Sequence, residues 1–167
     1  MNKIYAGIGS RQTPPEMLEK MTAIAYYLDR RGYVLRSGGA SGADSAFDKG
    51  STKKEIYLPW RGFNGSDSGL YDIPEEAYKI ASQILPEYSS CTDAIKRLKS
   101  RNMLQILGQD LNTPVEFVIC WTQDGKLRGG TAAAIRLAYL REIRVFNLAL
   151  NKDLEYIRHT IQNGADL

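Results

Sequence analysis

Three glycine-rich segments of the chain combine backbone donors with polar side chains that could hold a phosphate group. Each segment follows a short apolar run, and their sequences are GIGSRQTPP, SGGASGAD and TQDGKLRGGT. Glycine lets backbone N–H groups approach a ligand closely, and a helix that begins behind such a loop adds partial positive charge. Glycines at these turns can also be purely steric devices. Three such loops at one edge of one sheet would nevertheless predict a phosphate-binding site.

The side chains of the first two loops suggest more specific contacts. Arg11 directly follows Ser10, and its guanidinium could bind phosphate in a forked, charge-assisted way, or could pair with Glu16 at the surface. The Ser37 hydroxyl could reach a phosphate or a ribose. Asp44 stands at a predicted helix start, where it could stabilise the helix or accept hydrogen bonds from a ribose or base.

Other polar and aromatic residues allow two interpretations each. Thr131 follows two glycines at a helix start, so it could cap the helix or contact a ligand. Arg101 and Asn102 could reach the site if the long helix that contains them starts nearby, and otherwise form a solvated face. Trp60 and Arg61 follow the third apolar run, where the tryptophan could stack on a base or belong to the core.

The composition gives little support to metal or disulfide chemistry. His159 is the single histidine, and it lies in a polar helical stretch, which excludes a histidine-based metal site and a Ser-His-Asp arrangement elsewhere. Cys91 and Cys120 lie in unlike surroundings, and we expect both to be reduced thiols. We therefore expect neither a metal nor a cofactor, and no catalytic residue can be identified from these residue types.

The order of apolar runs and amphipathic segments predicts an open, parallel α/β sheet of about five strands, with helices on both faces. Buried strands separated by helices are typical of such sheets, and their ligands bind beyond the carboxyl ends of the strands. The strands are predicted in the runs 3–10, 33–39, 55–60, 114–121 and 143–150, and the helices over 14–31, 44–49, 74–86, 90–108, 131–142 and 153–162. Residues 61–73 are predicted to form a long surface loop.

Length and charge limit the remaining possibilities. The 167 residues predict one domain spanning 1–167, and 43% hydrophobic with 25% charged residues is ordinary for a globular protein. A net charge of +3 is compatible with phosphate-bearing ligands but is far below that of a protein that coats DNA. No run of 18 apolar residues and no secretory signal is present, so we expect a cytoplasmic protein without a membrane partner.

The segments GIGSRQTPP, SGGASGAD and GGTAAAIRLA, in this order, resemble the superfamily that joins the DNA-processing protein DprA (Smf) with the cytokinin-activating LOG enzymes. The resemblance covers about residues 2–149. RNMLQILGQDL with FVICWT is also similar to small DprA-like proteins encoded by bacteriophages. The resemblance implies a Rossmann-like fold with a pocket for nucleotides or their derivatives.

Carried over residue by residue, the resemblance implies the same ligand contacts that the loops suggest. It implies first-loop contacts at Gly9, Ser10 and Arg11, second-loop contacts at Ser37, Gly38, Gly39, Gly42 and Asp44, and a phosphate loop at Gly129, Gly130 and Thr131.

The sequence departs from the LOG enzymes at the position of their catalytic glutamate. That glutamate lies in a PGGxGTxxE motif and works with an upstream arginine. Here the motif's proline is missing and Ala134 stands in place of the glutamate. Arg101 could correspond to the arginine, but its acidic partner is missing. Without a carboxylate to activate water, a general acid–base contribution of about 10²–10⁴-fold would be absent. The sequence thus disfavours N-glycosidic hydrolysis of nucleoside monophosphates.

We therefore expect the chain to bind a nucleotide or nucleotide-derived phosphate, as a sensor, a sequestering module or an enzyme of unidentified chemistry. The alternative is a DprA-like protein that binds single-stranded DNA. Relatives in this superfamily often form dimers, and the apolar helix AAAIRLAYL could pack against a second subunit, so a homodimer is a further expectation.

Overall fold

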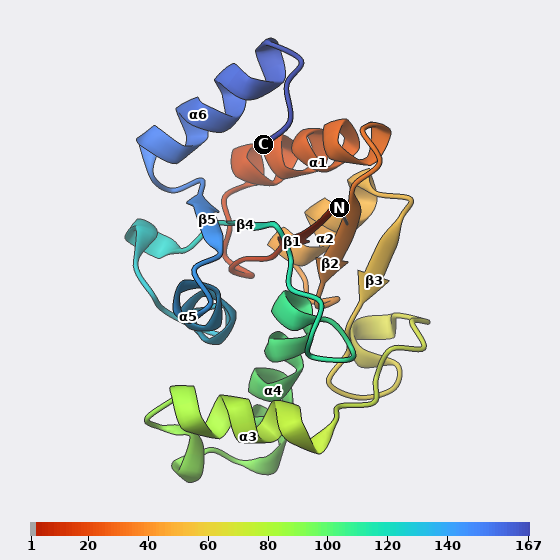
Figure 1. The fold of residues 1–167 in the computed structure, drawn as a ribbon, viewed down its shortest axis with the longest axis vertical. Helices are drawn as coiled ribbons and strands as arrows, with labels where there is room; N and C mark the ends of the chain where they lie inside the picture. Colours follow the sequence, from red (N-terminus) through yellow and green to blue (C-terminus); the bar gives the residue numbers. More distant parts are fainter. Residues whose placement is uncertain (1–2) are drawn as a thin grey trace.

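The computed structural model describes residues 3–167, which form a five-stranded parallel sheet covered by helices on both faces (Figure 1). The strands lie in the order β3-β2-β1-β4-β5. Their bounds are β1 Ile4–Gly7, β2 Val34–Ser37, β3 Lys54–Ile56, β4 Phe117–Cys120 and β5 Arg144–Asn147. The helices are α1 Pro15–Arg30, α2 Ala43–Gly50, α3 Glu75–Ile84, α4 Asp93–Leu107, α5 Ala132–Leu140 and α6 Asn151–Gln162. The fold class predicted from the sequence is confirmed.

The central strand, β1, is where the chain changes direction across the sheet. The chain passes from β1 outward to β2 and β3, then returns to β1's other side and continues outward to β4 and β5. In the register, Ala6 lies opposite Arg36 on one side and Val118 on the other. Such a reversal leaves a crevice at the carboxyl ends of the two strands that flank it.

Side chains alternate between two cores because the central strands are buried on both faces. Ile4 and Ala6 pack into the core beneath α3, α4 and α5, whereas Tyr5 packs into the core beneath α1, α2 and α6. The Tyr5 ring stacks on Phe117 of the neighbouring strand at 5.7 Å between ring centroids. This alternation without a polar face explains why the strands appear in the sequence as continuous apolar runs.

The third strand is shorter than the sequence suggested. The prediction covered 55–60, but regular pairing ends at Ile56, and Tyr57 then forms a single parallel bridge with Leu70. The Leu58 N–H donates to the Leu70 carbonyl at 2.8 Å. The loop predicted over 61–73 therefore folds back and extends the edge of the sheet beyond the last regular strand residue.

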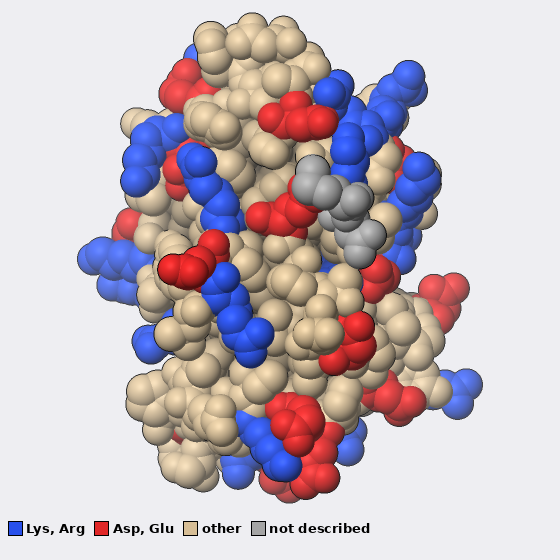
Figure 2. Space-filling model, in the orientation of Figure 1, with Lys and Arg blue, Asp and Glu red and all other residues tan. Residues whose placement is uncertain are grey.

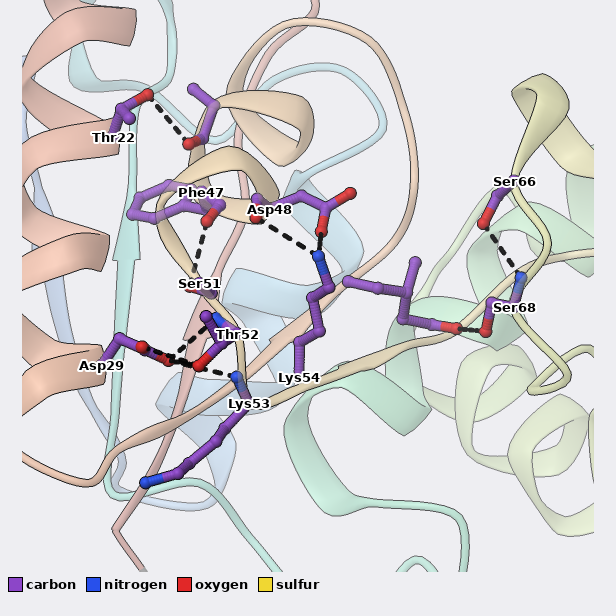
Figure 3. A network of polar contacts seen from close by, with 12 residues as sticks. Thr22, Asp29, Phe47, Asp48, Ser51, Thr52, Lys53, Lys54, Ser66 and Ser68 are labelled. Atoms are coloured by element: carbon purple, nitrogen blue, oxygen red, sulfur yellow. Dashed lines mark hydrogen bonds and ion pairs between the residues drawn. The ribbon is translucent and has the colours of Figure 1, made fainter.

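The segment that joins α2 to β3 is fastened by side-chain hydrogen bonds (Figure 3). The Asp29 carboxylate, at the end of α1, accepts hydrogen bonds from the backbone N–H groups of Thr52 and Lys53 at 2.9 and 3.1 Å. It also accepts from the Thr52 hydroxyl at 2.8 Å. Partial burial opposes ionisation, but these hydrogen bonds prevail and lower the pKa of Asp29. One carboxylate thus fixes where β3 begins.

Within residues 3–167, no helix combines the length and the apolar character needed to cross a membrane.

Replacing Asp29 tests this anchoring. We expect Asp29→Ala to lower the free energy of unfolding by about 1–2 kcal/mol, since two backbone donors and a hydroxyl lose their charged acceptor. Asp67→Ala, which removes an exposed carboxylate from the 61–73 loop, is the control and should change stability little. Urea unfolding at pH 7 measures both, and equal stabilities for the two variants would contradict the role of Asp29.

Candidate functional site

A cavity of about 510 Å³ opens at the carboxyl edge of the sheet, where β1 and β4 lie side by side. It collects residues from the first two glycine-rich loops, the 61–73 loop, α4 and the loop before α5. The lining consists of Ile8, Gly9, Ser10, Arg11, Gln12, Ala40, Asp44, Phe63, Ile95, Leu98, Lys99, Arg101, Asn102, Gln105, Arg128, Gly129, Gly130 and Thr131. The position is the one that the strand reversal favours for ligands.

The first loop is held against β4 by its backbone. The Ser10 N–H donates to the Trp121 carbonyl at 3.1 Å, and the Ser10 hydroxyl accepts from the N–H of Gln12 at 3.0 Å. A Cβ on Gly9 would lie 2.7 Å from Cβ of Ala43, so only glycine lets the loop pass this close to α2. Arg11 is exposed at the mouth of the cavity.

Of the five ligand contacts predicted in the second loop, one lines the cavity and four do not. Asp44 lines the cavity, whereas Ser37, Gly38, Gly39 and Gly42 do not. The Ser37 hydroxyl is buried and donates to the Gly7 carbonyl at 2.6 Å, which ties β2 to β1. The four residues therefore shape the loop rather than contribute surface to the cavity.

Gly38 is required by the crowding of polar side chains around it. A Cβ at this position would lie 2.7 Å from Nη1 of Arg101 and 2.9 Å from Oδ2 of Asp44, and still closer to the side-chain amide of Gln105. A larger residue would displace all three side chains. The absence of a side chain at Gly38 is what allows them to converge on one point of the backbone.

Asp44 is a buried carboxylate at the base of the cavity. It lies in the first turn of α2, is only 5% exposed, and accepts a hydrogen bond from the N–H of Ala40 at 3.2 Å. Burial raises the pKa of Asp44 to about 6, against the opposing effect of the Arg101 charge and of backbone donors. Asp44 therefore titrates near neutral pH and can exchange a proton or accept hydrogen bonds from a ligand.

Arg101 comes from the half of α4 that is buried on every side. Residues 100–107 are all buried, and they include the polar residues Ser100, Arg101, Asn102 and Gln105. A helix surrounded by protein is normally apolar all round, so polar side chains at such positions need a specific partner or a function. Three of these four side chains face the cavity.

The Arg101 guanidinium links α4 to the ends of two strands. Its Nη1 donates to the Gly38 carbonyl and, at 3.0 Å, to the Tyr57 carbonyl. The guanidinium also lies 5.6 Å from the centre of the Phe63 ring. Burial lowers the pKa of Arg101 to about 10, and the charge of Asp44 partly offsets this effect. The side chain remains a cation and keeps positive charge inside the cavity.

The third glycine-rich loop forms an open helix start on the cavity wall. Gly129 has a φ of +69°, which favours glycine, and neither Gly129 nor Gly130 has an atom within 4 Å of the place where a Cβ would stand. The Gly130 carbonyl accepts from the Asn102 side-chain amide at 2.7 Å, which attaches the loop to α4. Thr131 is buried, but its side chain makes no capping hydrogen bond to α5.

The cavity also contains residues that the sequence analysis did not assign to it. Phe63, Lys99, Gln105 and Arg128 all line it. Gln105 lies four residues after Arg101, so helical spacing from Arg101 could have indicated it. Phe63 comes from a loop whose course depends on the bridge to Leu70, and no local sequence pattern indicates that course.

Two further expectations concern acids and metals. Ala134, at the position of the LOG glutamate, is fully buried in the core and does not line the cavity. Asp44 is the sole carboxylate in the cavity lining of the described chain. Among residues 3–167, no three His, Cys, Asp or Glu side chains lie together in a way that could hold a metal ion.

The raised pKa of Asp44 predicts how stability depends on pH. The folded pKa of about 6 lies above the unfolded value near 3.9, so the stabilising effect of the protonated group is full below about pH 4. It is lost as the pH rises through 6, at a cost of about 2–3 kcal/mol. Asp44→Asn lacks this titration, so it should exceed the wild type in stability at pH 7.5 and approach it at pH 4.5.

Urea unfolding of both proteins from pH 4.5 to 7.5 measures this difference. The comparison isolates Asp44, because other carboxylates, including Asp29 and Asp166, have lowered pKa values and act in the opposite direction in both proteins. A difference that does not change with pH would contradict the assignment.

Comparison with solved structures identifies the fold. DNA processing protein A from Helicobacter pylori, described in a study of its single-stranded DNA binding mode, matches with a TM-score of 0.56 at 17% identity, over 99% of this chain and 75% of the other. DNA processing protein A (DprA) from Streptococcus pneumoniae matches with a TM-score of 0.56 at 19% identity, over 100% of this chain. The chain spans 58% of that protein.

Comparison of sequences matches no family model and no curated protein. The likeness to the two solved structures is therefore one of architecture, at identities below 20%. It confirms the resemblance to DprA at the level of the fold. The chain has the Rossmann-like, DprA-like α/β fold.

Proposed function

We propose that the cavity binds a nucleotide or a nucleotide-derived phosphate. The observation that carries the proposal is the meeting of an open helix start and a buried carboxylate in one cavity of about 510 Å³. Pockets for small ligands typically measure about 300–1,000 Å³ and place a few polar groups among apolar walls. Such a cavity suits a ligand with an anionic end and a hydroxyl-bearing end.

The two ends of the cavity have different chemistry. Phosphate would lie at the amino end of α5, where Gly129 and Gly130 leave the backbone uncovered and the helix dipole favours an anion. Arg128 directly precedes this helix start, and Arg11 also lines the cavity; neither arginine forms an ion pair with a carboxylate within residues 3–167. Charge-assisted hydrogen bonds from these arginines would add to the affinity.

The sugar and base would occupy the inner part of the cavity. Asp44 would accept hydrogen bonds from ribose hydroxyls, and the Gln105 side-chain amide would contact polar edges of the base. Phe63, Ile95 and Leu98 supply the apolar surface against which a base can lie. In this role the protein is a sensor, a sequestering module or a nucleotide-processing enzyme in which Asp44 is the available proton-transfer group.

Single-stranded DNA is the second candidate ligand, and the fold favours it. The Helicobacter pylori protein of the same fold is described in a study of how it binds single-stranded DNA. The charge gives less support, because the net charge is only +3, and on the face shown in Figure 2 Lys and Arg side chains lie among Asp and Glu. Proteins that follow a single strand use a continuous positively charged groove.

A binding panel with two variants tests the nucleotide proposal. We expect one or more of the nucleoside mono-, di- and triphosphates, ADP-ribose and NAD to bind, as measured by isothermal titration calorimetry. Arg11→Ala should weaken that binding about tenfold, because one charge-assisted contact to phosphate is lost. Thr131→Val, which keeps the shape of the side chain but removes its hydroxyl, should weaken it about fivefold.

Arg158→Ala is the matched control, since Arg158 lies exposed on α6 and pairs with Glu155. It should bind like the wild type. Binding of none of these nucleotides, or binding that both Arg11→Ala and Thr131→Val leave intact, would exclude the cavity as the site.

Salt dependence separates the two candidate ligands. For a single strand, the logarithm of the binding constant falls with the logarithm of the salt concentration, with a slope of about −0.7 per phosphate contacted. A twelve-nucleotide strand held by several contacts therefore loses affinity steeply between about 50 and 200 mM salt. A nucleotide in the cavity should lose affinity only mildly over the same range. Fluorescence anisotropy with labelled forms of both ligands measures the two slopes.

A further inference from the structure

A second, shallower groove lies beside the cavity, beyond the end of β3. Its volume is about 270 Å³, and we call it the aromatic groove. It is lined by Pro59, Trp60, Arg61, Tyr71, Asp72, Ile73, Tyr78 and Arg97. These residues come from the loop after β3, from α3 and from the exposed half of α4, and none of them lines the first cavity.

The aromatic groove and the cavity share a wall. The ring of Trp60, in the groove, meets the ring of Phe63, in the cavity, edge to face at 5.3 Å between centroids. On α4, Arg97 lines the groove and the next two residues, Leu98 and Lys99, line the cavity. The cavity and the groove are therefore neighbours, with the Trp60–Phe63 pair between them.

The groove presents aromatic rings to solvent. Trp60 and Tyr71 are each 36% exposed, and the Trp60 ring packs edge to face against Phe63. Aromatic side chains beside a backbone-binding groove are the usual platforms on which nucleic-acid bases stack.

The charges of the groove suit a nucleotide as well. Arg61 and Arg97 are exposed, and neither lies within ion-pair distance of a carboxylate in residues 3–167. Their guanidinium groups are available to a phosphate group of a ligand that extends from the cavity into the groove. Asp72 is the single acid of the groove lining, and its carboxylate can accept hydrogen bonds from the exocyclic amine of a base.

We propose that the aromatic groove is a second base-binding subsite, so that the ligand of this protein is a dinucleotide unit: two nucleosides joined through phosphate. One nucleotide occupies the cavity, the linking phosphate passes the Trp60–Phe63 pair, and the second base stacks on Trp60 under Arg97. This inference rests on the proposed function, because it extends the ligand from the first cavity. A free dinucleotide and a segment of a longer strand share this chemistry.

Affinity for paired ligands tests the subsite. We expect the 5′-phosphorylated ribodinucleotides of adenine, cytosine, guanine or uracil, which keep a 2′-hydroxyl for Asp44, to bind more tightly than the corresponding 5′-monophosphates in calorimetry. Trp60→Ala should weaken dinucleotide binding by about 5- to 150-fold, the usual range for a lost stacking contact. It should leave monophosphate binding unchanged.

Two further variants guard against indirect effects of removing Trp60 from Phe63. Arg97→Ala removes a cation of the groove without touching Phe63, and it should weaken the dinucleotide about tenfold but not the monophosphate. Tyr26→Ala removes an exposed aromatic side chain from α1, on the other face of the sheet, and should change neither affinity.

Fluorescence reports stacking directly. The chain has two tryptophans, so in the variant Trp121→Phe the emission comes from Trp60 alone. We expect the dinucleotides to quench this emission and the monophosphates to leave it unchanged.

The outcomes distinguish the subsite from the proposed function on which it rests. If monophosphates bind but dinucleotides bind no more tightly and do not quench Trp60, the subsite is wrong and the cavity stands. If neither ligand binds, both proposals fail. A twelve-nucleotide strand that binds more tightly than the dinucleotide, and loses affinity in Trp60→Ala, supports the subsite with a longer strand as its source.

Discussion

The buried guanidinium of Arg101 is the contact on which the arrangement of the site depends. One nitrogen donates to carbonyl groups at the ends of two adjacent strands, at Gly38 and Tyr57, and so fixes α4 against the carboxyl edge of the sheet. The same helix holds the loop before α5 through the contact from Asn102 to Gly130. Without this cation, the strand ends, the second loop and the α5 loop would lack a common point of attachment.

This arrangement has an energetic cost that the fold tolerates. Asp44 and Arg101 are both removed from water. Burial raises the pKa of Asp44 and lowers the pKa of Arg101, so in each case it favours the neutral form. Burying charged groups usually costs more than their mutual attraction returns, and an apolar pair of similar size would often be more stable. Retaining them where a cavity opens is typical of a site in which stability has been exchanged for function.

The sequence predicted the parts of the site that depend on local pattern. Glycines in the loops that follow apolar runs made Gly9 and the Gly129–Gly130 pair candidates, and all three line the cavity. The open parallel sheet followed from apolar runs that alternate with amphipathic segments. Asp44 and Arg101 were separate candidates, and their meeting was not predicted, since nothing local relates residues so far apart in the chain.

Other features were beyond sequence reasoning because they arise from long-range packing. Ser37 and Gly38 looked like ligand contacts, yet Ser37 bonds to a neighbouring strand and Gly38 makes room for three side chains. Phe63 enters the cavity only because the strand edge continues through the bridge between Tyr57 and Leu70. These outcomes depend on which loop packs over which strand, and side-chain type does not determine that.

The change of direction at β1 also bears on the motions of the sheet. The pairing of β1 with β4 joins a half built from residues 4–56 to a half built from residues 117–147, and the cavity lies across this seam. A molecule seated there touches both halves, so separating the two central strands would first require its release. A ligand bound in the cavity would therefore slow amide hydrogen exchange along β1 and β4 more than along the edge strand β3. The reason is that local opening between β1 and β4 would require the ligand to dissociate first.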